Sequence, residues 1–400
     1  MKILHVIPNP FYVERGGLVR AYRQIQIAGE QGWECHVACY HLGKELPGAI
    51  IHRIPGIPWY KNYAPGANMH RFYLDILLLI KTFRLAVKFR PDIIHAHLHE
   101  GVFAALPLAR RLKVPLLFDA EGSLSEEMAA DGFLGAALFK HIERYLTGQA
   151  DYILTSSRQL FSVMLDRFFV PRKKIFLFED HIDTLMFSPR PPNPTYREKL
   201  SIPPGAPVVV YIGSLDKLQG MEFLLKTAKL IASSVSAVHF LIVGFPDEKA
   251  WEDRFKRCGV LNCHFPGKAS RIEAVEYLSL GTVGVSAKRS GSSQGNGKLL
   301  DYMAMGLPVV AFDGKVNRDV LGEWGAYAPE NNIELFSALV LDFIKNPEAR
   351  RNTGEGLRKR VCDKFSTQTR GAQLLEIYSS IINNASLCAI NPNPSQKAVY

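Results

Sequence analysis

The sequence predicts an α/β protein built from two doubly wound domains, each a parallel sheet covered by helices on both faces. The 400 residues are too many for one ordinary core and suit two domains of roughly 150–200 residues. Apolar, β-branched runs alternate with helical segments along the chain. This alternation restarts after a proline-dense stretch at 187–207. We expect the domains to face each other across a cleft, with ligands beyond the carboxyl ends of the strands.

The first half contains a regular series of predicted strands with helices between them. A glycine pair, Gly16 and Gly17, follows the first strand and opens an amphipathic helix, and a long apolar and basic helix is expected near 72–89. Buried strands are predicted at 2–8, 35–40, 49–55, 92–97, 115–122 and 151–157.

The second half repeats this pattern after "FSPRPPNPTYREKLSIPPGAP", which we interpret as an interdomain linker with little core of its own. Strands and helices are predicted at 208–214, 219–232, 239–245, 248–258, 263–268, 270–279, 283–288 and 308–312. We therefore place one domain at 1–187 and the other at 188–368. A closing helix is expected at about 369–383, and the segment 384–400 lacks periodicity and is expected to be disordered.

Composition narrows the class of protein. A hydrophobic fraction of 47% with 22% charged residues is typical of a globular protein. The apolar runs are too short for a signal-peptide core or a membrane span, so we expect a cytoplasmic protein. The six cysteines form no CxxC pair and are interpreted as reduced thiols. The net charge of +10 favours anionic partners, but the basic residues do not cluster with aromatics as in nucleic-acid-binding proteins.

The segment "SGSSQGNGKLLDYMAMGLPVVAF" (290–312) is the most informative part of the chain. It matches neither the Walker loop nor the dinucleotide fingerprint. Gly295 and Gly297 would let the backbone approach a ligand, and a helix starting near Lys298 would offer free N–H groups to an anion. A lysine in a first turn opposes the helix dipole unless an anion lies there. Lys288 and Arg289 precede the loop, and the alternative is a solvated turn.

The order of motifs resembles the GT-B glycosyltransferases that include the retaining sugar-nucleotide enzymes of glycosyltransferase family 4. The resemblance extends over nearly all of residues 1–380. It depends on "GGLVRAY", "PDIIHAH", "HIDTLMFSP", "YIGSLDKLQGMEFLLKTAKLI" and "GKLLDYMAMGLPVVAFD". It implies two Rossmann-like domains, an N-terminal one for the acceptor and a C-terminal one for the nucleotide-sugar donor, with the last helix returning to the first domain. No cofactor or catalytic metal is expected.

The resemblance also implies a donor site, with departures at several positions. Asp301 matches the second acid of the paired-acid motif, which the family associates with the ribose, but Ser293 stands where the first acid is expected. Ser214 and Gln219 replace a basic pair that holds the phosphates, and Glu121 replaces a histidine near the sugar. The predicted donor-binding residues are Gly16, Gly17, Gly213, Ser214, Lys217, Gln219, Arg289, Gln294, Gly295, Asn296, Gly297, Lys298, Leu299 and Asp301.

Two residues are predicted to be catalytic, Lys298 and Glu121. Lys298, helped by Lys217, would stabilise the charge that develops on the leaving diphosphate; the alternative for Lys217 is a solvated loop lysine. Asp301 would accept hydrogen bonds from ribose hydroxyls, or it is simply an acid at a helix start. Glu121 would contact a sugar hydroxyl or act as a general base, with a helix-capping acid beside Ser123 as the alternative.

The acceptor is expected to contact His97, His99 and Tyr60. His95, His97 and His99 alternate, which puts them on one face of a strand, where hydrogen bonding is a simpler role than metal binding. Tyr60 belongs to an aromatic loop whose rings could stack on sugars. The helix near 72–90 carries basic residues beside an apolar surface, which suits an anionic membrane and a lipid-linked acceptor. We favour the plainer alternative, a core helix with a basic outer face.

These observations predict a metal-independent, retaining glycosyltransferase that moves a hexose-type sugar from a nucleotide sugar to a glycan or lipid-linked acceptor. The pathway would be cell-surface polysaccharide or glycolipid synthesis. One alternative is a GT-B sugar-nucleotide isomerase or epimerase. Another is a non-catalytic sugar-nucleotide binding protein, motivated by Ser214, Gln219 and Ser293. The nearby Lys217, Arg289 and Lys298 favour a diverged enzyme over a degenerate one.

Overall fold

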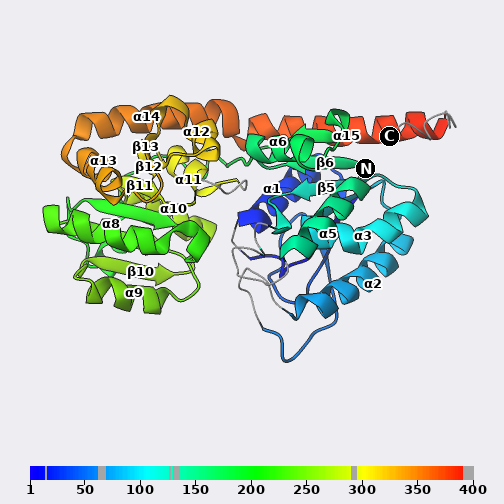
Figure 1. The fold of residues 1–400 in the computed structure, drawn as a ribbon, viewed down its shortest axis with the longest axis horizontal. Helices are drawn as coiled ribbons and strands as arrows, with labels where there is room; N and C mark the ends of the chain where they lie inside the picture. The colour runs from blue at the N-terminus through cyan, green and yellow to red at the C-terminus, as the bar shows by residue number, and fades with distance from the viewer. Residues whose placement is uncertain (14–15, 62–68, 126–127, 129–135, 290–294, 391–400) are drawn as a thin grey trace. The chain divides into compact units, whose positions relative to one another are not determined.

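A computed structural model of the chain describes residues 1–13, 16–61, 69–125, 128, 136–289 and 295–390. These residues form two compact units (Figure 1). Unit 1 comprises Met1–Val13, Gly17–Glu179 and the chain from Gly371 on, and unit 2 comprises Asp180–Arg370 together with Gly16. Each unit is an α/β structure with its own parallel sheet, which confirms the predicted fold class.

Within the described residues, unit 1 has a seven-stranded sheet in the order β3-β2-β1-β4-β5-β6-β7, and all its strand pairs are parallel. Strands β4 and β5 are buried along their whole length, and their sequences are apolar apart from His95, His97 and Asp119. The strands are β1 (Lys2–Ile7), β2 (Glu34–Cys39), β3 (Ile50–Arg53), β4 (Ile93–His97), β5 (Leu116–Ala120), β6 (Tyr152–Thr155) and β7 (Ile175–Leu177).

Helices connect these strands and cover the sheet. In Figure 1, α2, α3 and α5 lie beside one another, and α3 packs against both of the others. The helices of unit 1 are α1 (Gly16–Glu30), α2 (Arg71–Phe89), α3 (Leu98–Leu112), α5 (Ala136–Gln149), α6 (Arg158–Asp166), the 3-10 turn η1 (Arg172–Lys174) and most of α15 (Thr367–Ile390).

Unit 2 has a six-stranded parallel sheet among its described residues, in the order β10-β9-β8-β11-β12-β13. Its strands are β8 (Val208–Ile212), β9 (His239–Val243), β10 (Cys263–Gly267), β11 (Val283–Ser286), β12 (Val309–Phe312) and β13 (Ala326–Ala328). Its helical segments are α7 (Pro194–Lys199), η2 (Lys217–Gln219), α8 (Met221–Ser234), α9 (Glu248–Arg257), α10 (Arg271–Ser279), α11 (Lys298–Ala304), α12 (Lys315–Leu321), η3 (Gly322–Trp324), α13 (Ile333–Lys345) and α14 (Pro347–Phe365).

The proline-dense segment 187–207 is not a linker, so this prediction is wrong. Phe187 and Ile202 are buried in the core of unit 2. Between them, Asn193 caps α7 by accepting a hydrogen bond from the Thr195 amide, and Pro194 occupies the first helical position. Proline suits that position because its N–H would have no helical partner there. The units divide between Glu179 and Asp180, before the predicted boundary at 187/188.

The closing helix is longer than predicted. Helix α15 continues through Ile390, into the segment 384–400 that we expected to be disordered; residues 391–400 lie outside the described part of the chain. No proline or glycine occurs between Gly371 and Pro392, so nothing in the sequence stops the helix earlier. None of the described helices combines the length and the apolar character needed to cross a bilayer.

Candidate functional site

Lys298 stands at the centre of the candidate site in unit 2. Strands β8 and β11 are neighbours in the sheet, so the segments that follow them meet at its carboxyl edge. Lys298 begins α11, and its Nζ donates hydrogen bonds to Gln219 Oε1 and, at 3.4 Å, to Tyr211 Oη. The Tyr211 ring centre lies 4.7 Å from Nζ. The structure therefore brings together Lys298 and Gln219, two of the predicted donor residues.

Gly213 makes room for this lysine. Its φ is +148°, a backbone conformation that side chains rarely adopt. A Cβ at this position would lie 2.9 Å from Lys298 Cε and 3.2 Å from Nζ. The neighbouring Ser214 takes part through its carbonyl, which accepts a hydrogen bond of 2.6 Å from the Tyr211 hydroxyl. Lys217 begins η2, but its side chain lies outside the described residues.

The pKa of Lys298 is well below that of a free lysine. Burial and, to a smaller extent, the charge of Lys288 lower it to about 7, although Asp216 and Asp301 act in the opposite direction. Among the described residues, Lys298 forms no ion pair within 4 Å, and its hydrogen-bond partners are an amide oxygen and a phenol. An anionic ligand would stabilise the ammonium form and raise its pKa.

The loop before Lys298 is held by buried polar contacts. Lys288 Nζ donates a 2.6 Å hydrogen bond to the Gly295 carbonyl. The Asn296 amide donates to Ser286 Oγ at 3.1 Å and to Asn317 Oδ1 at 2.9 Å. Ser293 and Gln294 lie outside the described residues. Sequence reasoning missed the contributions of Ser286 and Asn317, because Asn317 comes from α12 and carries no motif of its own.

Three predicted donor residues, Asn296, Gly297 and Leu299, form contacts within the fold. The Leu299 side chain is fully buried. The amides of Leu299 and Leu300 donate to the carbonyls of Asn296 and Gly297, each at 3.0 Å. These two N–H groups are therefore not free for an anion, and the expectation of free amides at this helix start is wrong for them. Both N–H groups instead form hydrogen bonds within the tight turn that positions Lys298.

Asp301 and Arg289 already have charged partners. Both terminal nitrogens of Arg271 donate to Asp301 Oδ1 at 3.2 Å, and Asp301 is 8% exposed. Arg289 pairs with Glu330 at 3.2 Å on the surface. Arg271 was not predicted, although "SRIE" at 270–273 forms a capping box that fixes the start of α10.

In unit 1, the corresponding edge of the sheet contains a buried ion pair. Arg20 of α1 donates through Nε and a terminal nitrogen to Asp119 of β5, at 3.0 to 3.2 Å, and Gln24 donates to Asp119 Oδ2 at 2.7 Å. Burial alone would raise the pKa of Asp119, but attraction to Arg20 and His97 and these hydrogen bonds hold it below its usual value. This pair joins α1 to the centre of the sheet.

Glu121 lies two residues beyond Asp119, against the backbone of Gly17. A Cβ on Gly17 would fall only 1.6 Å from Glu121 Oε2, so glycine is required for this approach. Gly16 begins α1 with a φ of +26°. Ser123 donates a hydrogen bond of 3.1 Å to the buried Glu143 of α5.

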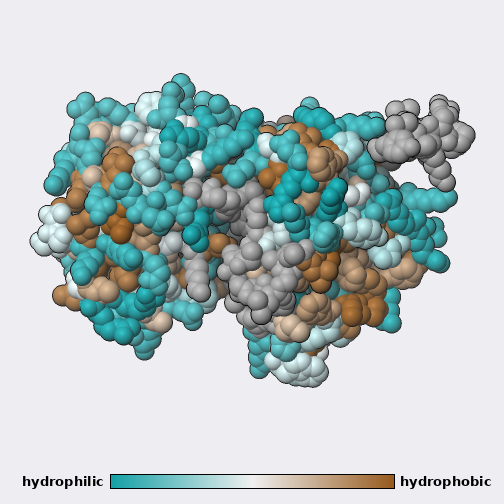
Figure 2. Space-filling view, in the orientation of Figure 1, coloured by the Kyte–Doolittle hydropathy of each residue, from teal (hydrophilic) through white to brown (hydrophobic). Residues whose placement is uncertain are grey.

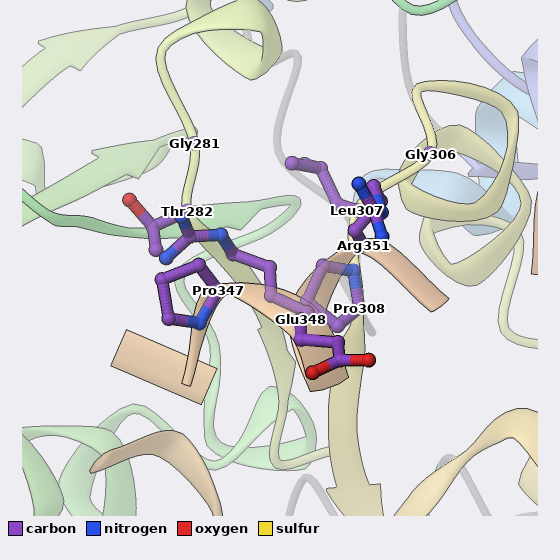
Figure 3. Close-up of a pocket in the computed structure, with 9 residues that line it drawn as sticks. Gly281, Thr282, Gly306, Leu307, Pro308, Pro347, Glu348 and Arg351 are labelled. Carbon is purple, nitrogen blue, oxygen red and sulfur yellow. The ribbon is translucent and has the colours of Figure 1, made fainter. Parts of the chain in front are cut away.

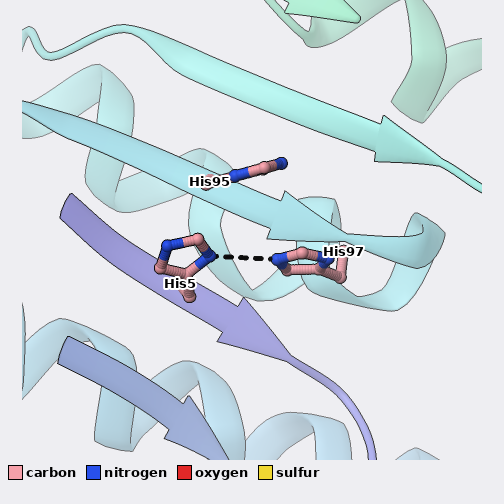
Figure 4. Close-up of side chains that lie close together, drawn as sticks. All are labelled: His5, His95 and His97. Atoms are coloured by element: carbon pink, nitrogen blue, oxygen red, sulfur yellow. Dashed lines mark hydrogen bonds between the residues drawn. The ribbon is translucent and has the colours of Figure 1, made fainter. Parts of the chain in front are cut away.

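Three histidines, His5, His95 and His97, form a buried cluster in unit 1 (Figure 4). His5 Nδ1 and His97 Nε2 are 3.1 Å apart, and His95 Nδ1 is 2.7 Å from the Tyr378 hydroxyl of α15. Burial lowers the pKa of all three histidines, that of His97 to about 4, although Asp119 opposes this. They are therefore neutral near pH 7.

Two overlapping groups in unit 1 have the composition of a metal site. His5, His95 and His97 each offer one ligand atom, and these atoms lie within 4.8 Å of one another. His97, Asp119 and Glu121 form a second such group. The neutral imidazoles suit metal binding, so the expectation of a metal-free enzyme stays a prediction.

Two of the predicted acceptor residues, His99 and Tyr60, are buried and do not belong to the group of His97, Asp119 and Glu121. His99 lies in α3 and not on the strand with His95 and His97, so the expectation of one shared face is wrong for it. It contacts Phe118 and lies 3.4 Å from the Thr147 hydroxyl. Tyr60 is 6% exposed and belongs to the core of unit 1. The part of its loop at 62–66 lies outside the described residues.

A pocket in unit 2 lies at the opposite edge of the sheet from Lys298. Thr282 precedes β11 and Pro308 precedes β12, so the pocket lies at the amino ends of these strands (Figure 3). Arg350 and Arg351 of α14 contribute to its lining. Because ligands of doubly wound sheets bind at the carboxyl edge, this pocket is not the candidate site.

Comparisons with known proteins agree across both units. Residues 16–185 match the family model "Glycosyltransferase Family 4", and residues 206–346 match "Glycosyl transferases group 1". A curated glycogen synthase of Mycobacterium tuberculosis is 21% identical over 298 residues, which cover 72% of this chain and 69% of that protein.

Solved structures are similar in fold. Sucrose-phosphate synthase from Thermosynechococcus elongatus matches with a TM-score of 0.82 at 16% identity, covering 96% of this chain and 99% of that one. Anabaena HepE in complex with UDP and glucose matches with a TM-score of 0.75 at 15% identity, covering 95% and 100% of the two chains.

Replacing Asp119 should destabilise the protein strongly. The substitution Asp119→Asn keeps the shape of the side chain but leaves Arg20 buried without its counter-charge, which we expect to cost about 3–5 kcal/mol. Urea unfolding measures this loss. Asp313→Asn, which removes an exposed pair with Arg318, should cost less than about 1 kcal/mol. Equal losses in the two variants would contradict the importance of the buried pair.

Lys298 should make stability depend on pH. Its pKa is about 7 in the folded chain and about 10.4 when unfolded. Between these values the unfolded state binds more protons, so stability should rise with pH. Between pH 6.5 and 9.5 this rise amounts to about 3 kcal/mol, or about 6–12 °C in Tm for a domain of this size. The substitution Lys298→Met should remove it. The exposed Lys226→Met in α8 serves as control, and an unchanged pH profile in Lys298→Met would contradict the prediction.

Proposed function

Because the chain belongs to the GT-B glycosyltransferases that resemble family 4, we propose that it transfers a sugar from a nucleotide-sugar donor to a glycan or lipid-linked acceptor. We further propose that the transfer retains the anomeric configuration, needs no metal, and serves cell-surface polysaccharide or glycolipid synthesis at the cytoplasmic side of a membrane. The observation that carries the proposal is the placement of the Lys298 ammonium at Gln219, beside Gly213.

Lys298 is well placed to receive a diphosphate. The family resemblance puts a basic pair at positions 214 and 219, where this chain has serine and glutamine. Lys298 reaches Gln219 from another loop and supplies a cation there. Its ammonium would stabilise the negative charge that develops on the leaving nucleoside diphosphate. HepE, which has a similar fold, was solved in complex with UDP-glucose, which supports a donor of this class.

Asp301 would bind the ribose of the same donor. Its Oδ1 accepts from Arg271, which holds the carboxylate in one orientation. The second oxygen, Oδ2, would accept from a ribose hydroxyl.

In unit 1, Glu121 is the best candidate for contact with the transferred sugar or the acceptor. It ends the β5 segment and lies against Gly17. Asp119 and Arg20 fix the strand and helix that bring these two residues together. Both roles considered for Glu121, a sugar-hydroxyl contact and a general base, remain compatible with this position. Of the three predicted acceptor residues, His97 alone joins this group.

Measuring how the donor is consumed distinguishes the proposed transferase from two other functions. A sugar-nucleotide isomerase would consume the donor without an acceptor. A non-catalytic binding protein would bind the donor without consuming it, which the substitutions at Ser214 and Gln219 could suggest. The ordered contacts of Lys298 with Gln219 and Tyr211 favour a working donor site.

Nucleoside diphosphates and their sugars should raise the Tm of the protein. We expect a shift with one base, because binding to the folded state alone stabilises it. The shift should be lost in Lys298→Ala and in Asp301→Ala, while the exposed Lys226→Ala should keep it. A thermal-shift screen over the common bases measures this. If no nucleoside diphosphate or nucleotide sugar stabilises the wild-type protein, the proposed donor site is wrong.

Transfer should not require a metal ion. Dialysis against EDTA should leave turnover of the preferred nucleotide sugar within about twofold of the untreated protein, because Lys298 supplies the positive charge at the leaving group. Elemental analysis before and after dialysis provides the control. A loss of activity that returns with Zn²⁺ or Mg²⁺ would contradict the prediction and would direct attention to the histidine cluster of unit 1.

A further inference from the structure

Helix α2 exposes an apolar stripe along its outer side. The exposed residues are spaced three or four positions apart, which places them on one side of a helix. They are Phe72, Ile76, Ile80, Phe83 and Val87. Phe72 and Ile76 are more than half exposed, at 58% and 54%. The opposite side of α2 is buried in the core of unit 1 through Leu74, Leu78 and Leu85, so the stripe is not needed for folding.

The neighbouring helices extend this apolar surface. Consecutive right-handed connections along β4, β5 and β6 put α2, α3 and α5 in one layer on the same side of the sheet. Phe103 of α3 is 44% exposed. On α5, Leu138, Ile142 and Tyr145 are exposed at helical spacing. Figure 2 shows hydrophobic residues gathered over the region where Figure 1 places these helices. We call the exposed apolar residues of α2, α3 and α5 the apolar face.

The charges around the apolar face have one sign. The three acids on these helices point away from solvent: Asp75 and Glu143 are buried, and Glu100 pairs with Arg71 at 3.1 Å. The exposed charged residues of the same helices are all basic, namely Arg84, Lys88, Arg110, Arg111, Lys140 and Arg144. The guanidinium of Arg111 lies 5.8 Å from the Phe83 ring centre, so positive charge borders the apolar stripe directly.

We propose that this surface of unit 1 binds an anionic lipid bilayer. The apolar side chains of α2 would enter the boundary between headgroups and acyl chains, and the exposed arginines and lysines would contact the anionic headgroups. Single exposed apolar residues are normal on soluble proteins, whereas a continuous group bordered by one sign of charge marks an interaction surface. The inward position of every acid on the three helices complements a negatively charged plane.

Helix α2 is buried on one side, as expected for a core helix near 72–89, but its outer side exposes apolar residues as well as basic ones. The proposal does not depend on the donor site, because its residues all belong to unit 1. Membrane binding and donor binding can therefore fail separately in experiments.

Vesicle sedimentation with the full chain tests the proposal. The wild-type protein should sediment with vesicles of phosphatidylcholine and phosphatidylglycerol, and about tenfold less with phosphatidylcholine alone. Raising the salt concentration should weaken binding to the anionic vesicles, because the Debye length shortens.

Two pairs of variants separate the apolar and electrostatic contributions. The double substitution Ile76→Ser/Ile80→Ser and the double substitution Arg84→Glu/Lys88→Glu should each lower binding to anionic vesicles about tenfold. Matched controls lie in unit 2: Leu261→Ser/Ile272→Ser changes two residues that are 73% and 69% exposed, and Lys226→Glu/Lys229→Glu changes two exposed lysines of α8. The controls should bind vesicles as the wild type does.

Three outcomes would overturn the proposal. The first is no binding of the wild type to anionic vesicles. The second is binding that both unit 1 variants and both controls change equally. The third is a dimer in sedimentation equilibrium that Ile76→Ser/Ile80→Ser dissociates, without vesicle binding, which would mean that a second copy of the chain covers the apolar face. An unchanged Tm in the variants excludes loss of folding as the cause.

Discussion

The candidate donor site depends on one constraint, the buried amino group of Lys298, whose hydrogen-bond partners among the described residues, an amide oxygen and a phenol, are both uncharged. These partners stabilise an ammonium less than a carboxylate would. An anionic ligand, as proposed for this site, would supply the opposite charge. Gly213 keeps the space for the lysine arm, and Lys288 and Asn296 fix the loop in front of it. Each of these contacts is consistent with the proposed binding of an anion.

In unit 1, by contrast, the central buried charge has a partner within the protein. The buried Asp119 has a partner of opposite charge, since Arg20 and Gln24 both donate hydrogen bonds to it. The pair works as a fixed support for the edge of the sheet where Glu121 approaches Gly17. The two units therefore share a topology but differ in their buried charged groups. In unit 2, Lys298 has no carboxylate in contact among the described residues, whereas in unit 1 the ion pair of Arg20 and Asp119 supports the sheet.

Much of the fold could be predicted because buried parallel strands have mainly apolar sequences, as β8 (VVVYI) and β12 (VVAF) illustrate. The errors have physical causes. Pro194 looked like part of a linker but begins a capped helix. The meeting of Lys298 and Gln219 requires β8 to pair with β11, across two intervening strands in sequence, and no local pattern encodes that. Arg271 and Asn317 were missed for the same reason, while Lys298, Gly213 and Asp301 were found through the motif order.

Helix α15 has a consequence for how the protein is made. Unit 2 is formed almost entirely by one continuous stretch, Asp180–Arg370, whereas unit 1 is completed by residues beyond Gly371. Leu374, Tyr378 and Ile381 are fully buried there, and Tyr378 is the hydrogen-bond partner of His95. During synthesis from the N-terminus, unit 1 obtains these residues only after the whole of unit 2 has been made. The second unit has its whole core earlier, so the order of folding on the ribosome runs against the order of the sequence.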